Sequence, residues 1–290
     1  MIVSRCGLLC GSLGCNEKYN CNCAGCLNAD QPFHGRCPVK DCCEARGHSH
    51  CGECDMIPCD KLFAYSYLDP EHGDHPQGAR IDVCRKWAAE GGRTWSNVLL
   101  TSAGWEDEQG NVKQNIRNRF LAMLGKPPEE ARVLFVTAAA VSDEHRYYAG
   151  LCRRQLINAG IRDIHIEPCD LEHPLSAGDA MPYDVVYLTG GDTVRLLRRI
   201  RETGFDAVIK KMVYADKVYV GVSAGSLVAA PSIGGPYDKE SAGLALVNAY
   251  LSVHCPAEAR PRTDLPLPHL ALTDSRALAV SCTGYELVSD

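Results

Sequence analysis

Short apolar runs separated by amphipathic stretches characterise the chain from residue 97 onward. Helical spacing of apolar side chains predicts helices over residues 112–124 and 148–156 and from about residue 193, with Gly160 placed to end the second. Strands that alternate with helices are typical of a mostly parallel sheet covered by helices on both faces. The runs predicted to be strands are residues 97–101, 132–136, 163–166, 184–188 and 217–221.

The first 95 residues follow a different pattern. They are rich in Cys, Gly, His and Asn, and within them residues 81–89 predict a short helix. Thirteen of the 17 cysteines lie between Cys6 and Cys84. So uneven a distribution indicates two regions with different chemistry. We therefore predict one domain at residues 1–95 and a second at residues 96–290.

Charge and hydropathy exclude several classes of partner. The net charge is −6 and no basic run occurs, so we do not expect a nucleic-acid partner. No apolar run approaches the roughly 18 residues that cross a bilayer, and the N-terminus lacks the basic start and apolar core of a secretion signal. We expect a soluble cytoplasmic protein with no membrane partner. In that compartment clustered cysteines favour metal ligation over disulfides.

A nucleophile elbow is predicted where the last of these strands ends. Residues 221–225 read Gly-Val-Ser-Ala-Gly, which fits the G-x-S-x-G pattern with a strand before it and a helix after it. The flanking glycines permit a tight turn that holds the Ser223 hydroxyl clear of the sheet. The alternative is a purely structural turn of small residues that enters a helix, but the strand-turn-helix setting favours a nucleophile.

A second loop, at residues 189–193, follows the strand at residues 184–188. Its paired glycines, Gly190 and Gly191, let backbone amides approach a ligand closely, which suits an oxyanion hole. Asp192 is expected to cap the helix that starts at Thr193. The two roles are compatible.

A serine nucleophile needs a base, and the base needs an acid to orient it. His254 ends the apolar stretch at residues 250–253, which we expect to be a strand that ends at the same edge of the sheet as the other two loops. Asp238 and Asp274 are both candidate acids, and spacing alone leaves the choice open.

These residues carry a family resemblance that extends from residue 97 to the C-terminus. The chain resembles the serine peptidases that include aspartyl dipeptidase and cyanophycinase, within the class I glutamine-amidotransferase-like superfamily. The resemblance implies a flavodoxin-like three-layer sandwich. The matching segments are residues 97–104 (NVLLTSAG), 124–128 (LGKPP), 187–193 (YLTGGDT), 221–226 (GVSAGS) and 231–233 (PSI).

The resemblance also assigns roles. It implies that Ser223 is the nucleophile, that His254 is the base, and that Gly191 and Ala224 supply oxyanion-hole amides. Asp238 lies where the dipeptidase branch carries an aspartate, and Asp274 where the cyanophycinase branch places its acid. We favour Asp274, because it follows the His254 strand closely enough to reach the imidazole.

Substrate choice rests on the resemblance alone. It implies hydrolysis of short peptides, with acidic dipeptides one option. The stretch at residues 255–268 is short and proline-rich, whereas the family carries a helix and basic residues there; Arg260 and Arg262 are the candidate replacements for substrate binding. The assembly state is open, and a homodimer is one option.

The N-terminal cysteines form paired motifs at residues 6–10 (CGLLC), 23–26 (CAGC) and 51–59 (CGECDMIPC). This segment resembles a cysteine-rich bacterial domain of unknown function whose members are suspected zinc binders. Cys-x-x-Cys pairs place two thiolates at chelating distance, so we predict a zinc-stapled domain, with an iron–sulfur cluster as the rival. The predicted ligands come from Cys6, Cys10, Cys23, Cys26, Cys37, Cys42, Cys51, Cys54 and Cys59.

Two alternatives belong to other functional classes. In one, the fold binds a small molecule or a partner and Ser223 does no chemistry. In the other, the cysteine-rich segment is the functional part and acts as a metal or redox sensor.

Overall fold

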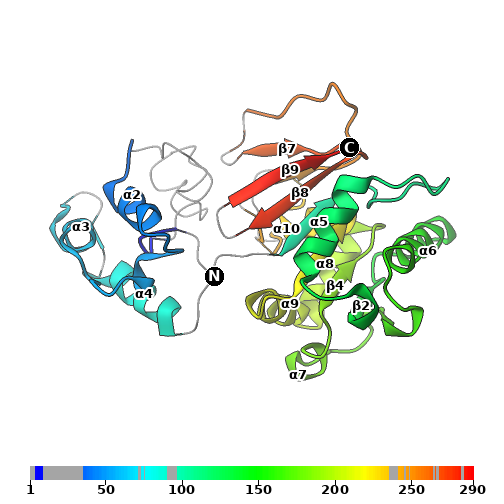
Figure 1. The fold of residues 1–290 in the computed structure, drawn as a ribbon, viewed down its shortest axis with the longest axis horizontal. Coiled ribbons are helices and arrows are strands. Elements are labelled where there is room, and N and C mark those ends of the chain that lie inside the picture. The colour runs from blue at the N-terminus through cyan, green and yellow to red at the C-terminus, as the bar shows by residue number, and fades with distance from the viewer. Residues whose placement is uncertain are drawn as a thin grey trace. The chain divides into compact units, whose positions relative to one another are not determined.

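The chain divides into two compact units. One comprises Met1–Trp95 together with Cys282–Gly284, and the other comprises Ser96–Ser281 and Tyr285–Asp290 (Figure 1). Each has its own apolar core. The computed structural model describes residues 4–8, 35–70, 73–74, 76–89, 97–234, 241–244, 246–247, 249–263, 265, 268–281 and 284–290.

The first unit is built from short helices. Pro38 starts α2, a position where the missing N–H of proline costs no hydrogen bond. The helix predicted for residues 81–89 is confirmed as the last of the series. The described elements are α2 (Pro38–Ala45), a 3-10 turn (Cys51–Glu53), α3 (Asp60–Phe63), a π-helical turn (Ala64–Leu68) and α4 (Ala79–Ala89). The core side chains are Cys6, Val39, Cys43, Cys51, Leu62, Ile81, Cys84 and Trp87.

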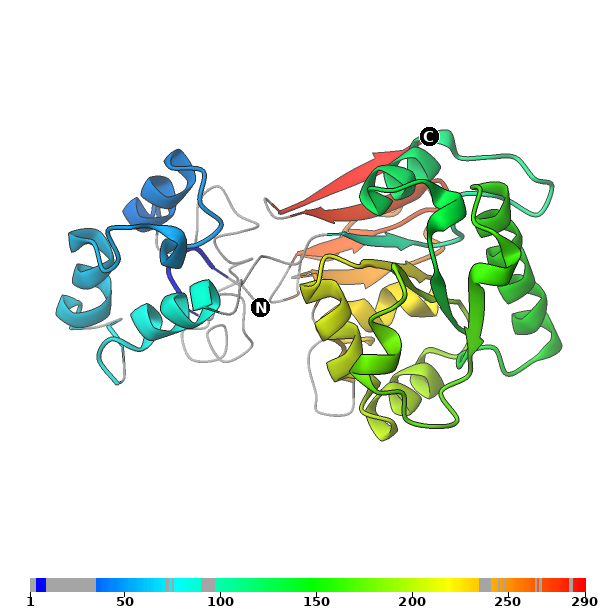
Figure 2. The same cartoon turned by 60° about the horizontal axis from the view of Figure 1, so that its bottom comes forward.

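A seven-stranded sheet organises the second unit, in the order β3-β2-β4-β5-β1-β8-β9. The five strands from β3 to β1 are parallel, and β8 runs antiparallel to β1. Figure 2 shows β8 and β9, in red, at one edge of this sheet. The strands are β1 (Val98–Thr101), β2 (Val133–Val136), β3 (Ile166–Cys169), β4 (Val185–Leu188), β5 (Val218–Val222), β8 (Arg276–Ser281) and β9 (Gly284–Ser289).

Four of the five predicted strands are confirmed to within one residue. The prediction for residues 163–166 was wrong, because Asp163–His165 is a 3-10 turn and β3 begins only at Ile166. Arg153 fixes that turn: its guanidinium donates to Asp163 Oδ1 (2.7 Å) and to the Asp163 carbonyl (3.0 Å).

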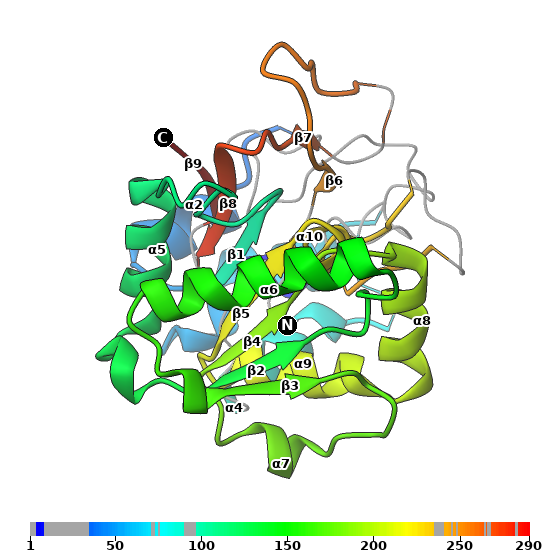
Figure 3. The same cartoon turned by 90° about the vertical axis from the view of Figure 1, so that its right-hand side faces the viewer.

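Helices cover both faces of the sheet. Figure 3 shows α6 lying across one face, where α5 also packs. The shorter helices α8, α9 and α10 lie on the other face, with α10 against β5. The three-layer, mostly parallel arrangement expected from the sequence is therefore present. The helices are α5 (Gln114–Leu124), α6 (Asp143–Asn158), α7 (Ala177–Ala180), α8 (Thr193–Glu202), α9 (Phe205–Tyr214) and α10 (Ala224–Ala229).

An aromatic cluster fills the core between α5, α6 and the sheet. Trp105 stacks on Phe120 of α5 with ring centroids 4.7 Å apart, and meets Tyr187 of β4 edge-on. Full burial of side chains this large stabilises the fold by roughly 2–3 kcal/mol each. Val112, predicted to lie on the helix, precedes it instead and forms a β-bridge with Glu106.

A second, two-stranded parallel sheet pairs β6 (Tyr250–Ser252) with β7 (His269–Ala271). The strand before His254 was expected in the main sheet, so this placement is a correction. Its partner lies beyond a proline-rich loop, a long-range pairing that periodicity does not reveal. Among the described residues, none of the helices combines the length and apolar character that would let it cross a membrane.

Candidate active site

Ser223 occupies a strained turn between β5 and α10. Its φ of 49° and ψ of −108° are costly for a residue with a side chain, and such strain gathers at functional sites. The flanking glycines are required for packing. A β-carbon at Gly221 would lie 2.5 Å from the Gly225 carbonyl oxygen, and one at Gly225 would lie 2.3 Å from that of Leu188. The elbow geometry predicted from the sequence is thus confirmed.

A hydrogen-bonded chain runs from Ser223 through His254 to Asp274. Ser223 Oγ lies 3.0 Å from His254 Nε2, and His254 Nδ1 lies 2.7 Å from Asp274 Oδ1. A carboxylate only accepts, so Nδ1 carries the proton and Nε2 is left to accept from the serine. The side chains of His254 and Asp274 are 50% and 61% exposed, so substrate can reach the imidazole from solvent.

The backbone of Gly190 adjoins the Ser223 side chain. A β-carbon on Gly190 would lie 3.6 Å from Ser223 Oγ, so this glycine directly adjoins the nucleophile. Gly191 has a φ of +131° and no room for a side chain, since a β-carbon would lie 2.2 Å from the Ala139 carbonyl oxygen. Within the described residues, the backbone N–H groups of Gly190 and Gly191 donate no hydrogen bond to another backbone carbonyl. Ala224 begins α10, where the first N–H groups have no acceptor within the helix.

Asp192 caps α8, as predicted. Its side chain accepts from the Arg195 N–H at 2.9 Å, and its own N–H donates to the Ala139 carbonyl at 3.0 Å. The cap fixes where the helix begins, and so fixes the two glycines that precede it.

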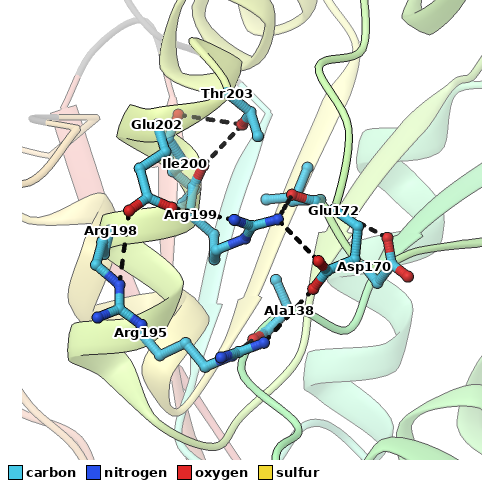
Figure 4. Close-up of polar contacts among 10 residues, drawn as sticks. Ala138, Asp170, Glu172, Arg195, Arg198, Arg199, Ile200, Glu202 and Thr203 are labelled. Carbon is cyan, nitrogen blue, oxygen red and sulfur yellow. Dashed lines mark hydrogen bonds and ion pairs between the residues drawn. The ribbon is translucent and has the colours of Figure 1, made fainter.

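Arginines of α8 hold the neighbouring loops in place (Figure 4). Arg195 Nε donates to the Ala138 carbonyl (3.3 Å), and its guanidinium pairs with Glu172 (3.5 Å). Arg199 pairs with Glu172 (3.3 Å) and donates to the Leu171 carbonyl (2.6 Å). The loops that follow β2 and β3 are therefore tied to the helix that follows the two glycines.

Residues 98–265 match the model of peptidase family S51. That match spans more than half of the chain, and it includes both Ser223 and His254. The chain belongs to peptidase family S51. Asp274 lies beyond the end of the match, so family membership by itself does not select the acid.

Two peptidases are similar to part of the chain. It is 29% identical over 101 residues to the uncharacterized peptidase Lin0382 of Listeria innocua, covering 35% of this chain and 48% of the relative. It is 33% identical over 139 residues to Peptidase E of Streptomyces coelicolor, covering 47% and 52%. The chain thus spans about half the length of these relatives.

A solved structure shares the fold. The crystal structure of a candidate peptidase E protein from Listeria monocytogenes EGD-e superposes with a TM-score of 0.53 at 20% identity, covering 67% of this chain and 98% of that one. The likeness shows that this chain shares its α/β fold with that protein.

Of the two candidate acids, only Asp274 lies among the described residues. Asp274 follows β7 and lies within hydrogen-bonding distance of the His254 imidazole. Asp238 lies outside the described residues. Its rival role therefore stays a prediction, and the geometry given above favours Asp274.

The predicted substrate arginines lie in the loop between β6 and β7. Arg260 and Arg262 are both exposed, and the Arg262 backbone N–H donates to His269 Nδ1 at 3.0 Å. Their part in substrate binding stays a prediction.

Sequence reasoning missed Lys113. Burial lowers the pKa of its amine, and the negative charge of Asp274 is the strongest influence in the opposite direction. Its ammonium donates to the Gly104 carbonyl at 3.3 Å. A cation therefore lies within electrostatic range of the proposed acid. A lysine just before a helix carries no signal of this in the sequence.

Several predicted metal ligands lie around a cavity in the first unit. The lining includes the predicted ligands Cys42, Cys51, Cys54 and Cys59, and also Cys43, which was not predicted to bind metal. Among the described residues, however, no group of three or more His, Cys, Asp or Glu side chains is arranged to hold a metal ion. The predicted ligands Cys10, Cys23 and Cys26 lie outside the described residues. The described thiols alone do not complete a zinc or iron–sulfur site.

Cys43 and Cys84, which are not among the predicted ligands, are free thiols buried in the core beside Cys51. The Cys51 thiol hydrogen-bonds to Cys43, which lowers the pKa of Cys43 and raises that of Cys51. Burial raises the pKa of Cys84 to about 12. These thiols contribute apolar packing in a unit with few aliphatic side chains.

Proposed function

We propose that the second unit is a serine peptidase that cleaves short peptides through an acyl-enzyme on Ser223. The observation that carries the proposal is the continuous hydrogen-bonded chain from Ser223 to Asp274, with both links at or below 3.0 Å. Nucleophile, base and orienting acid in this order are the arrangement that activates a serine hydroxyl.

The reaction follows from that geometry. His254 Nε2 takes the hydroxyl proton as Ser223 Oγ attacks the peptide carbonyl carbon. The resulting oxyanion is stabilised by backbone N–H groups, for which Gly190, Gly191 and Ala224 are the proposed donors. The imidazolium gives its proton to the departing amine as the C–N bond breaks. Water then attacks the ester as the same imidazole takes its proton; the ester C–O bond breaks, the imidazolium returns that proton to Ser223 Oγ, and the acid is released.

The preference for short peptides rests on membership of family S51 and on relatives named Peptidase E. We propose dipeptides and similarly short peptides as the substrate class, with acidic residues among the first to test.

The test is a hydrolysis profile on a library of di- to octapeptides, read by mass spectrometry. The wild-type protein should release free amino acids or short fragments from a subset of the library, and Ser223→Ala should release none. Thr203→Val removes a hydroxyl from the C-terminal end of α8 and serves as a matched control that should cleave as wild type. A silent wild-type protein would instead favour the binding or metal-sensing alternatives.

A further inference from the structure

The hydroxyl of Ser102 lies between the segments that carry His254 and Asp274. Ser102 Oγ accepts from the His254 backbone N–H at 3.1 Å and donates to the Leu272 carbonyl at 2.9 Å. Leu272 precedes Asp274 by two residues. Ser102 is only 1% exposed, so both bonds are shielded from solvent.

The position of Ser102 makes this bridge important. His254 and Asp274 follow the strands of the small β6–β7 sheet, whereas Ser223 follows β5 of the main sheet. Ser102 follows β1, which is paired with β5. Its hydroxyl therefore connects the main sheet to the segments that carry the base and the acid.

Thr101, the residue before Ser102, forms a hydrogen bond to the backbone of the nucleophile Ser223. The Thr101 carbonyl accepts from the Ser223 N–H at 2.9 Å and from Ser226 Oγ at 2.7 Å. Thr101 and Ser102 thus bond directly to Ser223 and His254 and, through Leu272, to the segment that carries Asp274.

His254 needs such support. Its φ is 54°, a left-handed conformation that is unfavourable for a residue with a side chain. Such a conformation persists only where the surroundings fix it, and the bond from its N–H to Ser102 is one such constraint.

We propose that Ser102 is a positioning residue for the catalytic chain. It sets the distance between the imidazole and the Ser223 hydroxyl without touching the reacting atoms. The inference rests on the proposed peptidase function. A displacement of about 1 Å in a catalytic group can cost about 100-fold in rate, so we expect Ser102→Ala to lower kcat by about 10- to 100-fold.

The experiment compares Ser102→Ala, Ser102→Thr and Thr203→Val with the wild type, measuring kcat, KM and the thermal midpoint on the best library peptide. Ser102→Ala should lower kcat and leave KM within about threefold. Ser102→Thr keeps the hydroxyl and should retain much more of the rate. Thr203→Val should change neither constant. An unchanged kcat in folded Ser102→Ala, or equal losses in the alanine and threonine variants, would overturn the proposal.

A second readout needs no substrate. The proton shared by His254 Nδ1 and Asp274 should give a low-field NMR resonance, assigned by its loss in Asp274→Asn. In Ser102→Ala this resonance should shift or broaden, while Thr203→Val should leave it in place. An unchanged resonance in Ser102→Ala would also overturn the proposal. Absence of hydrolysis in the wild type would reject the peptidase function and leave this measurement valid.

Discussion

Replacing Asp274 by asparagine tests how the imidazole is oriented. The carboxylate accepts from His254 Nδ1 at 2.7 Å and so leaves Nε2 free to accept the serine proton. An asparagine amide can donate to Nδ1 instead, which places the imidazole proton on Nε2. In that tautomer His254 can no longer act as the base toward Ser223.

The expected loss of kcat can be estimated from the solvent exposure of Asp274 and His254. In the serine protease template, where the aspartate is buried, the same change costs about 10⁴-fold in kcat. Here the Asp274 side chain is 61% exposed and that of His254 50%, so water can partly replace the carboxylate. We therefore expect a smaller loss of about 10²- to 10³-fold, which corresponds to about 3–4 kcal/mol in the activation barrier.

The assay is steady-state hydrolysis of one library peptide, with circular dichroism to confirm folding. Asp274→Asn should lower kcat with little change in KM or thermal midpoint. Asp238→Asn is the matched control, and its effect should be milder. A kcat within threefold of wild type for Asp274→Asn, or a larger loss for Asp238→Asn, would refute the assignment of the acid.

The remaining predictions concern the oxyanion loop, one ion-pair cluster and the thiols. Gly191→Ala should reduce kcat at least 100-fold or impair folding, because its β-carbon would lie 2.2 Å from a carbonyl oxygen, whereas Gly150→Ala, with open space around it, should be silent in the hydrolysis assay. Asp184→Asn should lower the free energy of unfolding by about 1–2 kcal/mol at pH 7. Burial raises the pKa of Asp184, but the Arg132 N–H, Lys126 and Lys217 together hold it below its usual value. The stabilisation is therefore complete above about pH 4 and is lost as the pH falls through the lowered pKa, so denaturation curves of wild type and variant should converge in acid. Elemental analysis should find at least one zinc per chain; less than one, together with disulfides between the paired cysteines, would contradict the zinc prediction.

The elbow could be predicted because all of its signals are local. A buried strand, two glycines that no other residue could replace and a run of small residues entering a helix all lie within residues 218–229. The capping role of Asp192 could be predicted for the same reason, because its side chain accepts from the N–H of Arg195, only three residues away.

The acid could not be chosen from the residues alone. His254 and Asp274 meet because β6 pairs with β7 across a proline-rich loop, and neither strand is longer than three residues. Such short strands carry little periodic signal, and the family resemblance left both aspartates open, so the preference for Asp274 rested only on its position shortly after the His254 strand. Ser102 was overlooked for a related reason: both of its partners lie more than 150 residues away.

The cysteines of the first unit show another limit. Spacing treats every paired thiol as a ligand, yet Cys51 packs in a core with Cys43 and Cys84, which lie outside the paired motifs. A buried thiol behaves as a small apolar side chain, and the sequence pattern does not separate this use from ligation.

Covalent labelling of Ser223 tests the central claim most directly. A fluorophosphonate reacts with an activated serine hydroxyl and leaves a stable adduct that intact-mass measurement and peptide mapping locate. The account predicts one adduct per chain on Ser223 in the wild type and none in Ser223→Ala, whose thermal midpoint should stay close to that of the wild type. A wild-type protein that stays unlabelled while folded, or that is labelled equally in the alanine variant, would contradict it.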